Sequence, residues 1–377
     1  METLQKKSKK MNIPFVDLNA QYQSIKSEID AAINNVVSEA AFIGGKYVKR
    51  FEEDFAKIYG VNHVVSCANG TDSLYIIMKM LGIGIGDEVI TVANSWISSS
   101  ETIGQTGATP IFVDIDKEYY SIDIELFKQA ITGKTKAIIL VHLQGQACNL
   151  DEIESICKKH NIHLIEDCAQ SHFTEYYGRK AGTVGIAGSF SFYPGKNLGA
   201  YGDAGCIITN DKEFADKCRM FATHGALKKH QHQIEGINSR MDGIQAAILS
   251  AKIPHILHWT DKRIENANHY MNCLSNCKDI ILPKIRPNSK HTFHLFVIRA
   301  KKRDELVNYL KENGIETAIH YPSPLPLLAA YSNRGFNANQ FKVAAEYQHE
   351  ILSLPMYAEL NKMKIEFISS KIIEFYK

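Results

Sequence analysis

Strand-like runs alternate along this chain with runs that are typical of amphipathic helices. The strand-like runs are short and apolar, and they cover residues 61–67, 88–93, 110–114, 137–142 and 163–166. Apolar residues with helical spacing lie between them, as at residues 122–131 and 150–160. This alternation predicts an α/β fold with a mainly parallel sheet that helices cover on both faces.

The order changes after Gly188, where two strand-like runs flank a loop that contains Lys196. A long helical stretch at residues 242–274 is expected to link two domains. A smaller α+β unit is expected to follow, with a strand at 293–299 and a helix at 303–313. We therefore expect a flexible extension at residues 1–12, a large domain at 13–250, and a linking helix with a small C-terminal α+β domain at 251–377.

Lys196 stands alone in a run of small, turn-forming and aromatic residues at 189–205. A lysine in such surroundings can lose water, lower its pKa and become a nucleophile toward an aldehyde. The alternative is an ordinary solvated loop lysine.

Asp167 ends a short buried strand, and strand ends are where open α/β sheets carry their chemistry. A carboxylate there can pair with a protonated ring nitrogen, such as that of pyridoxal 5′-phosphate. The alternative is that Asp167 caps a turn. Together with Lys196, the cofactor interpretation is favoured.

A strand, a turn with glycine and a helix start follow one another at residues 64–74. Because helix N-termini present unpaired N–H groups, Gly70 and Thr71 are candidates for holding a phosphate. Helix capping by Thr71 or Asp72 is the alternative. Trp96, one of two tryptophans, follows the next strand and is placed to stack on a cofactor ring, although core packing is the usual role of this residue type.

Taken together, these segments resemble the DegT/DnrJ/EryC1/StrS family of pyridoxal-phosphate-dependent sugar aminotransferases. The resemblance runs through nearly the whole chain after the first dozen residues, at 67–72, 82–91, 107–116, 135–145, 165–170, 190–205, 238–249 and 320–324. It implies the aspartate-aminotransferase-like fold (fold type I), with a mainly parallel seven-stranded sheet in the large domain.

The resemblance also implies roles for single residues. Lys196 matches the lysine that bonds to the cofactor and carries the proton, Asp167 the partner of the ring nitrogen, and Gln170 the amide beside the ring's 3-hydroxyl. Gly70, Thr71 and Ser191 match phosphate contacts, and Trp96 a stacking aromatic that is more often Phe or Tyr.

Other implied roles concern the substrate and a second subunit. Asn238 resembles a residue that reaches the phosphate of the neighbouring subunit's cofactor, with Arg240 nearby, which implies a homodimer with shared active sites. His320 and Tyr321 fall where the family approaches the substrate, although such a pair is more often structural.

Lysine at position 196 favours transamination, because some relatives carry histidine there and act as dehydratases. The implied substrates are L-glutamate and a nucleotide-linked ketosugar, for amino-sugar or O-antigen synthesis. Residues 13–18 resemble relatives that act on 3-keto rather than 4-keto sugars. A cyclitol or other non-nucleotide ketone, a sugar dehydratase and a non-catalytic regulator stay open as alternatives.

Composition narrows the class of protein. With 45% hydrophobic and 22% charged residues, the chain is typical of soluble globular proteins. Its net charge is +2, but the first ten residues hold four lysines and one glutamate, so the rest carries −1, which argues against nucleic acid as a partner. No apolar stretch reaches membrane-spanning length, so we expect a cytoplasmic protein. The eight cysteines lack CxxC spacing and are expected to be buried thiols, and the histidines, His230 and His232 included, form no coherent metal-ligand set.

Overall fold

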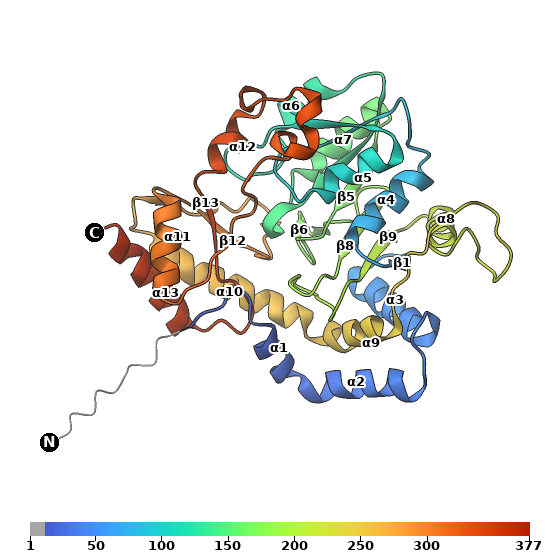
Figure 1. Cartoon of the computed structure of the whole chain (residues 1–377), viewed down its shortest axis with the longest axis horizontal. Helices are drawn as coiled ribbons and strands as arrows, with labels where there is room; N and C mark the ends of the chain where they lie inside the picture. The colour runs from blue at the N-terminus through green and yellow to red at the C-terminus, as the bar shows by residue number, and fades with distance from the viewer. Residues whose placement is uncertain (1–11) are drawn as a thin grey trace.

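The structure, a computed structural model, describes residues 12–377. Its centre is a seven-stranded sheet with the order β1-β9-β8-β5-β4-β2-β3 (Figure 1). Only β9 runs antiparallel to its neighbours, and the other pairings are parallel. The strands are β1 (His63–Cys67), β2 (Glu88–Val92), β3 (Thr109–Val113), β4 (Thr135–Val141), β5 (His163–Asp167), β8 (Ala187–Ser191) and β9 (Gly205–Thr209). The predicted mainly parallel sheet is confirmed.

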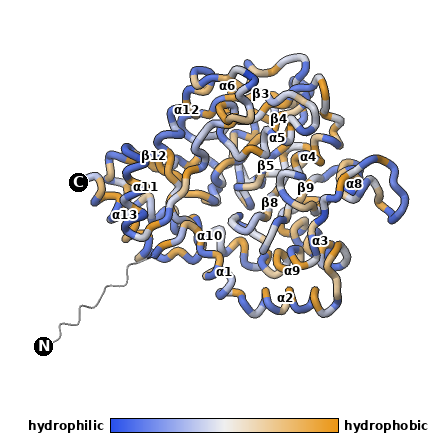
Figure 2. Tube along the Cα trace, viewed as in Figure 1, coloured by the Kyte–Doolittle hydropathy of each residue, from blue (hydrophilic) through white to orange (hydrophobic). Residues whose placement is uncertain are grey.

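Helices cover both faces of this sheet. On one face, a core cluster joins strand residues to Leu74, Ile103 and Ile153 from the helices of that side. Those helices are α4 (Gly70–Met80), α5 (Ser98–Thr106), α6 (Ile124–Ala130), α7 (Leu150–His160) and α8 (Lys212–Ala222). On the other face, Phe51 and Phe55 of α3 (Gly45–Tyr59) pack with residues of α9 (Gly243–Lys252). Apolar residues concentrate in these buried layers (Figure 2).

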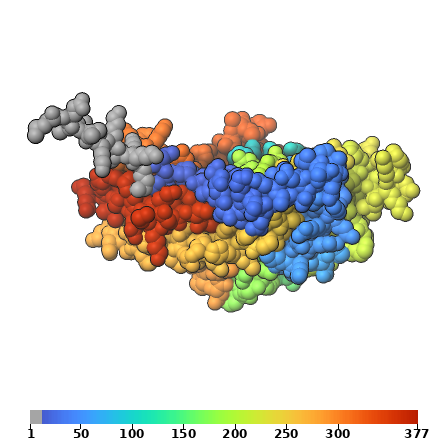
Figure 3. Space-filling model, turned by 90° about the horizontal axis from the view of Figure 1, so that it is seen from below, coloured from blue at the N-terminus to red at the C-terminus, as the bar shows by residue number. Residues whose placement is uncertain are grey.

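Two N-terminal helices, α1 (Leu18–Ser24) and α2 (Lys26–Ser38), lie outside the second layer. Helix α2 packs against α9. In Figure 3 the region from α1 to α3 (blue) crosses the face between the C-terminal unit (red) and the α8 region (yellow).

The predicted helical stretch 242–274 is wrong in one respect, because it is interrupted. Helix α9 ends at Lys252, a 3-10 turn spans Ile253–His255, and α10 runs over Ile256–Leu274. Pro254 has no N–H to donate and therefore breaks the ladder of the helix at this point.

A smaller α+β unit follows α10. Its sheet has the order β10-β12-β13, and the unit contains β10 (Ile280–Ile281), β12 (Phe296–Ala300), α11 (Arg303–Glu312), β13 (Ile351–Leu354) and α13 (Lys362–Phe375). Strand β12 begins three residues later than predicted, since Phe293 adopts a positive φ of 44° that extended strand cannot accommodate. A further small sheet joins β6 (Glu175–Tyr176), β7 (Arg179–Lys180) and β11 (Ser289–Lys290).

One late segment returns from the smaller unit to the main sheet. It contains 3-10 turns at Leu325–Leu327, Ala329–Arg334 and Ala338–Gln340, and helix α12 (Lys342–Tyr347). The N–H of Leu325 donates to the carbonyl of Ala93 at 2.7 Å, and the N–H of Val343 donates to Asp114 at 2.8 Å. This return brings residues 320–321 close to the strand ends of the sheet.

Three minor expectations can be compared with this fold. Six cysteines are buried as predicted, but Cys273 and Cys277 are half-buried, and all eight are free thiols. Within residues 12–377 no helix is long and apolar enough to cross a bilayer. The predicted extension falls, apart from Asn12, outside the described residues.

Candidate active site

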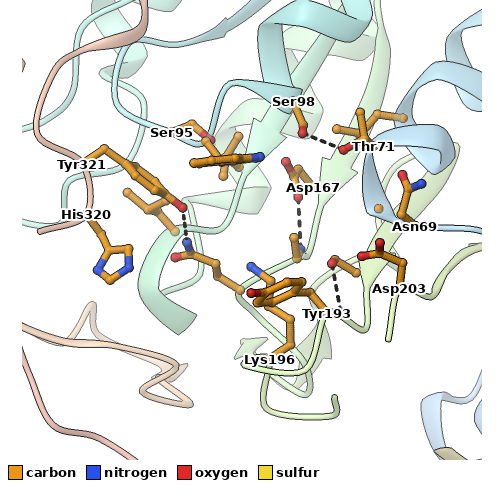
Figure 4. Close-up of a pocket in the computed structure, with 18 residues that line it drawn as sticks. Asn69, Thr71, Ser95, Ser98, Asp167, Tyr193, Lys196, Asp203, His320 and Tyr321 are labelled. Atoms are coloured by element: carbon orange, nitrogen blue, oxygen red, sulfur yellow. Dashed lines mark hydrogen bonds between the residues drawn. The ribbon is translucent and has the colours of Figure 1, made fainter. Parts of the chain in front are cut away.

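A cavity of about 450 Å³ opens at the carboxyl ends of the parallel strands. Residues that follow β1, β2, β4, β5 and β8 line it, together with residues of the late segment. Nine of the predicted site residues meet there: Gly70, Thr71, Trp96, Asp167, Gln170, Ser191, Lys196, His320 and Tyr321. In Figure 4 the side chains of Thr71, Asp167, Lys196, His320 and Tyr321, which come from distant parts of the chain, lie around this one space.

Lys196 sits on the loop that joins β8 to the antiparallel β9. The N–H of Lys196 donates to the carbonyl of Tyr193 at 2.8 Å, and the N–H of Ala200 donates to the carbonyl of Phe192 at 2.7 Å, so the loop is a folded turn. Removal from bulk water lowers the pKa of the Lys196 amine to about 8, and the negative charge of Asp167 opposes this shift only in part. Lys196 is half-buried and lines the cavity, so its position favours the nucleophile interpretation over an ordinary solvated loop lysine.

Asp167 is 6% exposed at the end of β5. Its Oδ1 accepts the N–H of Ala169 at 3.0 Å, and its Oδ2 accepts the hydroxyl of Ser99 at 3.1 Å. Burial raises the pKa of the carboxyl, while these two hydrogen bonds and the nearby Lys196 lower it. Asp167 also caps a turn, as the alternative interpretation predicted, because its bond to Ala169 closes that turn.

Three serines at the start of α5 or just before it make contacts in the site that the sequence did not predict. The hydroxyls of Ser95 and Ser99 lie 2.8 Å apart, and Ser99 is fully buried. Ser98 lies 2.7 Å from the hydroxyl of Thr71. The only signal in the sequence was an unusual density of serine directly after a strand.

Gln170 is held between two partners. Its Oε1 accepts the N–H of Gln144 at 2.7 Å, and its Nε2 donates to the phenol oxygen of Tyr321 at 2.8 Å. Tyr321 in turn lies 5.9 Å from Trp96, ring centroid to ring centroid, at a tilt of 46°. Because the indole is 60% exposed, Trp96 is not a core residue and its ring face is free for a flat ligand.

The turn before α4 has the features of an anion site. Asn69 caps the helix by accepting the N–H of Asp72 at 2.8 Å, so the predicted capping by Thr71 or Asp72 is wrong. A Cβ at Gly70 would lie 2.7 Å from the Cβ of Ser191, which explains why the turn needs glycine there. Asn69, Gly70 and Thr71 line the cavity together with Ser191, and a helix N-terminus at this position presents unpaired N–H groups to an anion.

His320 lies at the opposite side of the cavity. Its Nδ1 lies 2.9 Å from the hydroxyl of Ser353, and its ring stacks on Phe15 at 5.7 Å. Burial, and next the charge of Lys196, lower the pKa of His320 to about 4, so the imidazole is neutral near pH 7. Burial likewise raises the pKa of Tyr321, which keeps its phenol protonated.

Asn238 and Arg240 do not reach this cavity within one chain. Both are exposed, and Arg240 lines a separate hollow of about 730 Å³ beside α3 and α8. Their implied roles at a neighbouring subunit stay predictions.

The arrangement fits pyridoxal phosphate better than a metal. It offers an anion site at one end, a buried carboxylate for a ring nitrogen, a reactive amine, and an aromatic face. Among residues 12–377, no three His, Cys, Asp or Glu side chains gather as metal ligands would.

Comparison with known proteins gives the family. A sequence model of the DegT/DnrJ/EryC1/StrS aminotransferase family matches residues 23–373. A pleiotropic regulatory protein of Geobacillus stearothermophilus is 43% identical over 97% of this chain and 99% of its own. The dTDP-3-amino-3,6-dideoxy-alpha-D-galactopyranose transaminase of Aneurinibacillus thermoaerophilus is 40% identical over 94% of this chain and 97% of its own. The crystal structure of Streptomyces venezuelae DesV has a TM-score of 0.95 at 35% identity, and covers 97% of this chain and 99% of DesV.

These matches extend over nearly the whole chain, and the fold type I architecture agrees with them. Pyridoxal 5′-phosphate is the cofactor of such aminotransferases. The protein is therefore a pyridoxal-phosphate-dependent transaminase, and it belongs to the DegT/DnrJ/EryC1/StrS aminotransferase family.

Proposed function

We propose that this transaminase moves the amino group of L-glutamate to the C3 keto group of a nucleotide-linked deoxysugar, in the cytoplasmic synthesis of an amino sugar for O-antigen or a related glycan. The observation that carries the proposal is the meeting of Lys196, Asp167 and the Gly70–Thr71 turn in one cavity. C3 is favoured over C4 by residues 13–18 and by the 3-amino product in the name of the Aneurinibacillus relative.

When bound, pyridoxal phosphate supplies an electron-withdrawing ring that stabilises negative charge at the carbon that loses a proton. Lys196 is the residue that would hold its aldehyde covalently, and as a free amine it would act as the base. With a pKa of about 8, about a tenth of the amine is unprotonated at pH 7, far more than for a solvated lysine. Its Nζ takes the proton from Cα of L-glutamate, and in the second half-reaction it returns a proton to the sugar carbon that receives nitrogen.

Asp167 keeps the ring nitrogen protonated, since its carboxylate is held by Ser99 and Ala169 in a fixed orientation. Gln170 would lie beside the ring's 3-hydroxyl and Trp96 would stack on the ring, since both residues line the cavity. Gly70, Thr71 and Ser191 hold the phosphate through N–H and hydroxyl groups. Together these contacts would orient the cofactor toward Lys196, and such positioning contributes to the rate of a bound reaction.

His320 and Tyr321 line the side of the cavity that remains for the substrate. As a neutral imidazole and a protonated phenol, they suit hydroxyl groups of a sugar better than a charged group. We further propose a homodimer in which Asn238 reaches the neighbouring cofactor phosphate and Arg240 the substrate.

The test is an assay of purified protein with ¹⁵N-labelled L-glutamate and a panel of dTDP- and UDP-linked 3-keto and 4-keto sugars. We expect ¹⁵N at C3 of one product by NMR. Label at C4, or transfer only to a cyclitol, would overturn the substrate proposal, and loss of a hydroxyl without nitrogen transfer would indicate a dehydratase.

A second test addresses the residues. Lys196→Ala should lose the near-visible absorbance band of lysine-bound cofactor and all turnover, whereas the exposed Lys159→Ala should keep both. Asp167→Asn should still bind cofactor but lose most turnover. Wild-type rates in either site variant would refute the assignment, and a wild-type protein without the band would favour a non-catalytic regulator.

A further inference from the structure

Ser239 connects two parts of the molecule that lie far apart in sequence. It is fully buried, although both neighbours, Asn238 and Arg240, are exposed. Its hydroxyl donates to Oδ2 of Asp72 at 2.6 Å and accepts the N–H of Ala68 at 3.1 Å. One side chain thus binds both ends of the turn at residues 68–72 that precedes and opens α4.

The hydroxyl of Ser239 bridges the two ends of this turn. Ala68 ends one side of it, and Asp72, which is itself held by Asn69 at 2.8 Å, lies in the first turn of α4. Gly70 and Thr71 lie between the two bonds. A serine hydroxyl has one hydrogen to donate, and here it donates it in the hydrogen bond to Asp72. This bond fixes the orientation of the hydroxyl, so its oxygen accepts the N–H of Ala68.

Ser239 also belongs to a segment that backbone hydrogen bonds tie to the end of α8, among them the N–H of Ile237 to the carbonyl of Phe221 at 2.8 Å. Residues 223–242 leave the end of α8, project from the edge of the molecule (Figure 1) and return to α9. Most side chains at 227–235 are exposed. Near Ser239, the segment is held by the N–H of Ser239 to the carbonyl of Ala222 at 3.0 Å and by a bridge between Thr223 and Asn238. The hydroxyl of Ser239 is therefore its link to the cofactor turn.

From these contacts we propose that Ser239 is a positioning residue that couples the phosphate-binding turn to segment 223–242. Phosphate bound at Gly70 and Thr71 orders the turn, and the turn orders the segment through the hydroxyl of Ser239, together with the exposed Asn238 and Arg240. By linkage, order in the segment favours phosphate binding to the same degree. This rests on the proposed location of the cofactor phosphate, and on no assumption about the sugar substrate.

The first measurement is affinity. Apoprotein is titrated with pyridoxal phosphate and with pyridoxal, which lacks the phosphate. In Ser239→Ala the N–H of Ala68 and the carboxylate of Asp72 lose a buried partner, so we expect pyridoxal phosphate to bind about tenfold more weakly and pyridoxal to bind as in wild type. Equal weakening of both compounds, or of neither, would overturn the proposal.

The second measurement is hydrogen exchange with inorganic phosphate as the ligand. In wild type, phosphate should slow exchange in peptides covering residues 68–80 and also in those covering 223–242. In Ser239→Ala, protection of 223–242 should be lost while some protection of 68–80 remains. If the variant still protected 223–242, the coupling would not depend on Ser239.

The controls separate this inference from the proposed function. Ser369→Ala removes another buried hydroxyl, one that makes no hydrogen bond to a described residue, and should change neither readout. Ser239→Cys keeps the volume with a weaker hydrogen-bonding group, so it should give an intermediate loss and serves if the alanine variant does not fold. Absence of phosphate protection at 68–80 in wild type would instead refute the location of the cofactor phosphate.

Discussion

The hydroxyl of Ser99, in the first turn of α5, donates a 3.1 Å hydrogen bond to Oδ2 of Asp167 at the end of β5. This bond stabilises the ionised form of a carboxyl whose pKa is raised by burial. Ser95 extends the contact, since its hydroxyl lies 2.8 Å from that of Ser99 and its side chain lines the cavity. Neighbours on a different strand–helix unit therefore favour the ionised form of Asp167, against the effect of burial.

Ser99→Ala should raise the pKa of Asp167 further. Turnover should fall several-fold, and the acidic limb of the profile of kcat against pH should move to higher pH, because the carboxylate is then protonated at a higher pH. Ser99→Thr keeps the hydroxyl and should restore the wild-type limb. A uniform loss of rate with an unchanged profile would mean that Ser99 only packs.

The pH dependence of the rate of cofactor uptake should give the pKa of Lys196. Since only the free amine attacks an aldehyde, the rate at which apoprotein takes up pyridoxal phosphate should rise with pH with a midpoint near pH 8. A solvated lysine would give a midpoint at about pH 10.4. Stopped-flow absorbance across this range makes the measurement.

The Asp167→Asn variant adds a test of sign to that experiment. The charge of Asp167 raises the pKa of Lys196, so its removal should move the midpoint to lower pH. A midpoint that moved upward would contradict the electrostatic relationship between the two residues.

Gly70 should tolerate no side chain. A Cβ there would lie 2.7 Å from the Cβ and 3.1 Å from the Cα of Ser191, so Gly70→Ala must displace the phosphate turn or β8. We expect affinity for pyridoxal phosphate to fall at least tenfold in fluorescence titrations. Gly133→Ala, where an added Cβ meets nothing within 4 Å, is the matched control and should bind normally. Equal affinities of the two variants would show that the turn adapts.

How far the sequence predicted this site depends on the range of the contacts. Asp167 and Lys196 could be found because strand ends and a glycine-rich loop are local patterns. Gln170, Tyr321 and Trp96 entered through the family resemblance or their place after a strand. Their mutual contacts join residues far apart in the chain, as in the bond from Gln170 to Tyr321 across 151 positions. Periodicity carries no information about such pairs.

The missed features have the same physical origin. The cap at Asn69 was assigned to Thr71 or Asp72 because a sequence gives the capping residue types but not the φ/ψ angles that choose among them. The contacts of Ser99 and Ser239 depend on tertiary packing, and a serine looks the same in sequence whether it is solvated or buried. The break at Pro254, by contrast, was visible in the sequence, since proline rarely continues a helix.

The last prediction concerns Glu166, which precedes Asp167 in β5. Glu166 is fully buried and accepts the N–H groups of Gly182, Val184 and Gly185 at 2.7–2.8 Å. It also lies 2.9 Å from Nε2 of His142. Because the N–H of Cys148 donates to Nδ1 of that ring at 3.2 Å, Nε2 carries the proton and donates to the carboxylate.

Burial alone would raise the pKa of Glu166, but the hydrogen bonds from His142 and the backbone outweigh it and lower that pKa. A carboxyl with a lowered pKa in the folded state stabilises the fold above its unfolded pKa, and this stabilisation is lost as pH falls through the folded value. Glu166→Gln should therefore reduce the free energy of unfolding by about 3 kcal/mol at pH 7, and by progressively less below about pH 4.3. Urea unfolding at several pH values measures this difference, with the exposed Glu265→Gln as the variant expected to match wild type. A destabilisation that stayed constant down to pH 3 would mean that the charge of Glu166 makes no contribution, and that the loss comes from replacing an acceptor oxygen by an amide donor.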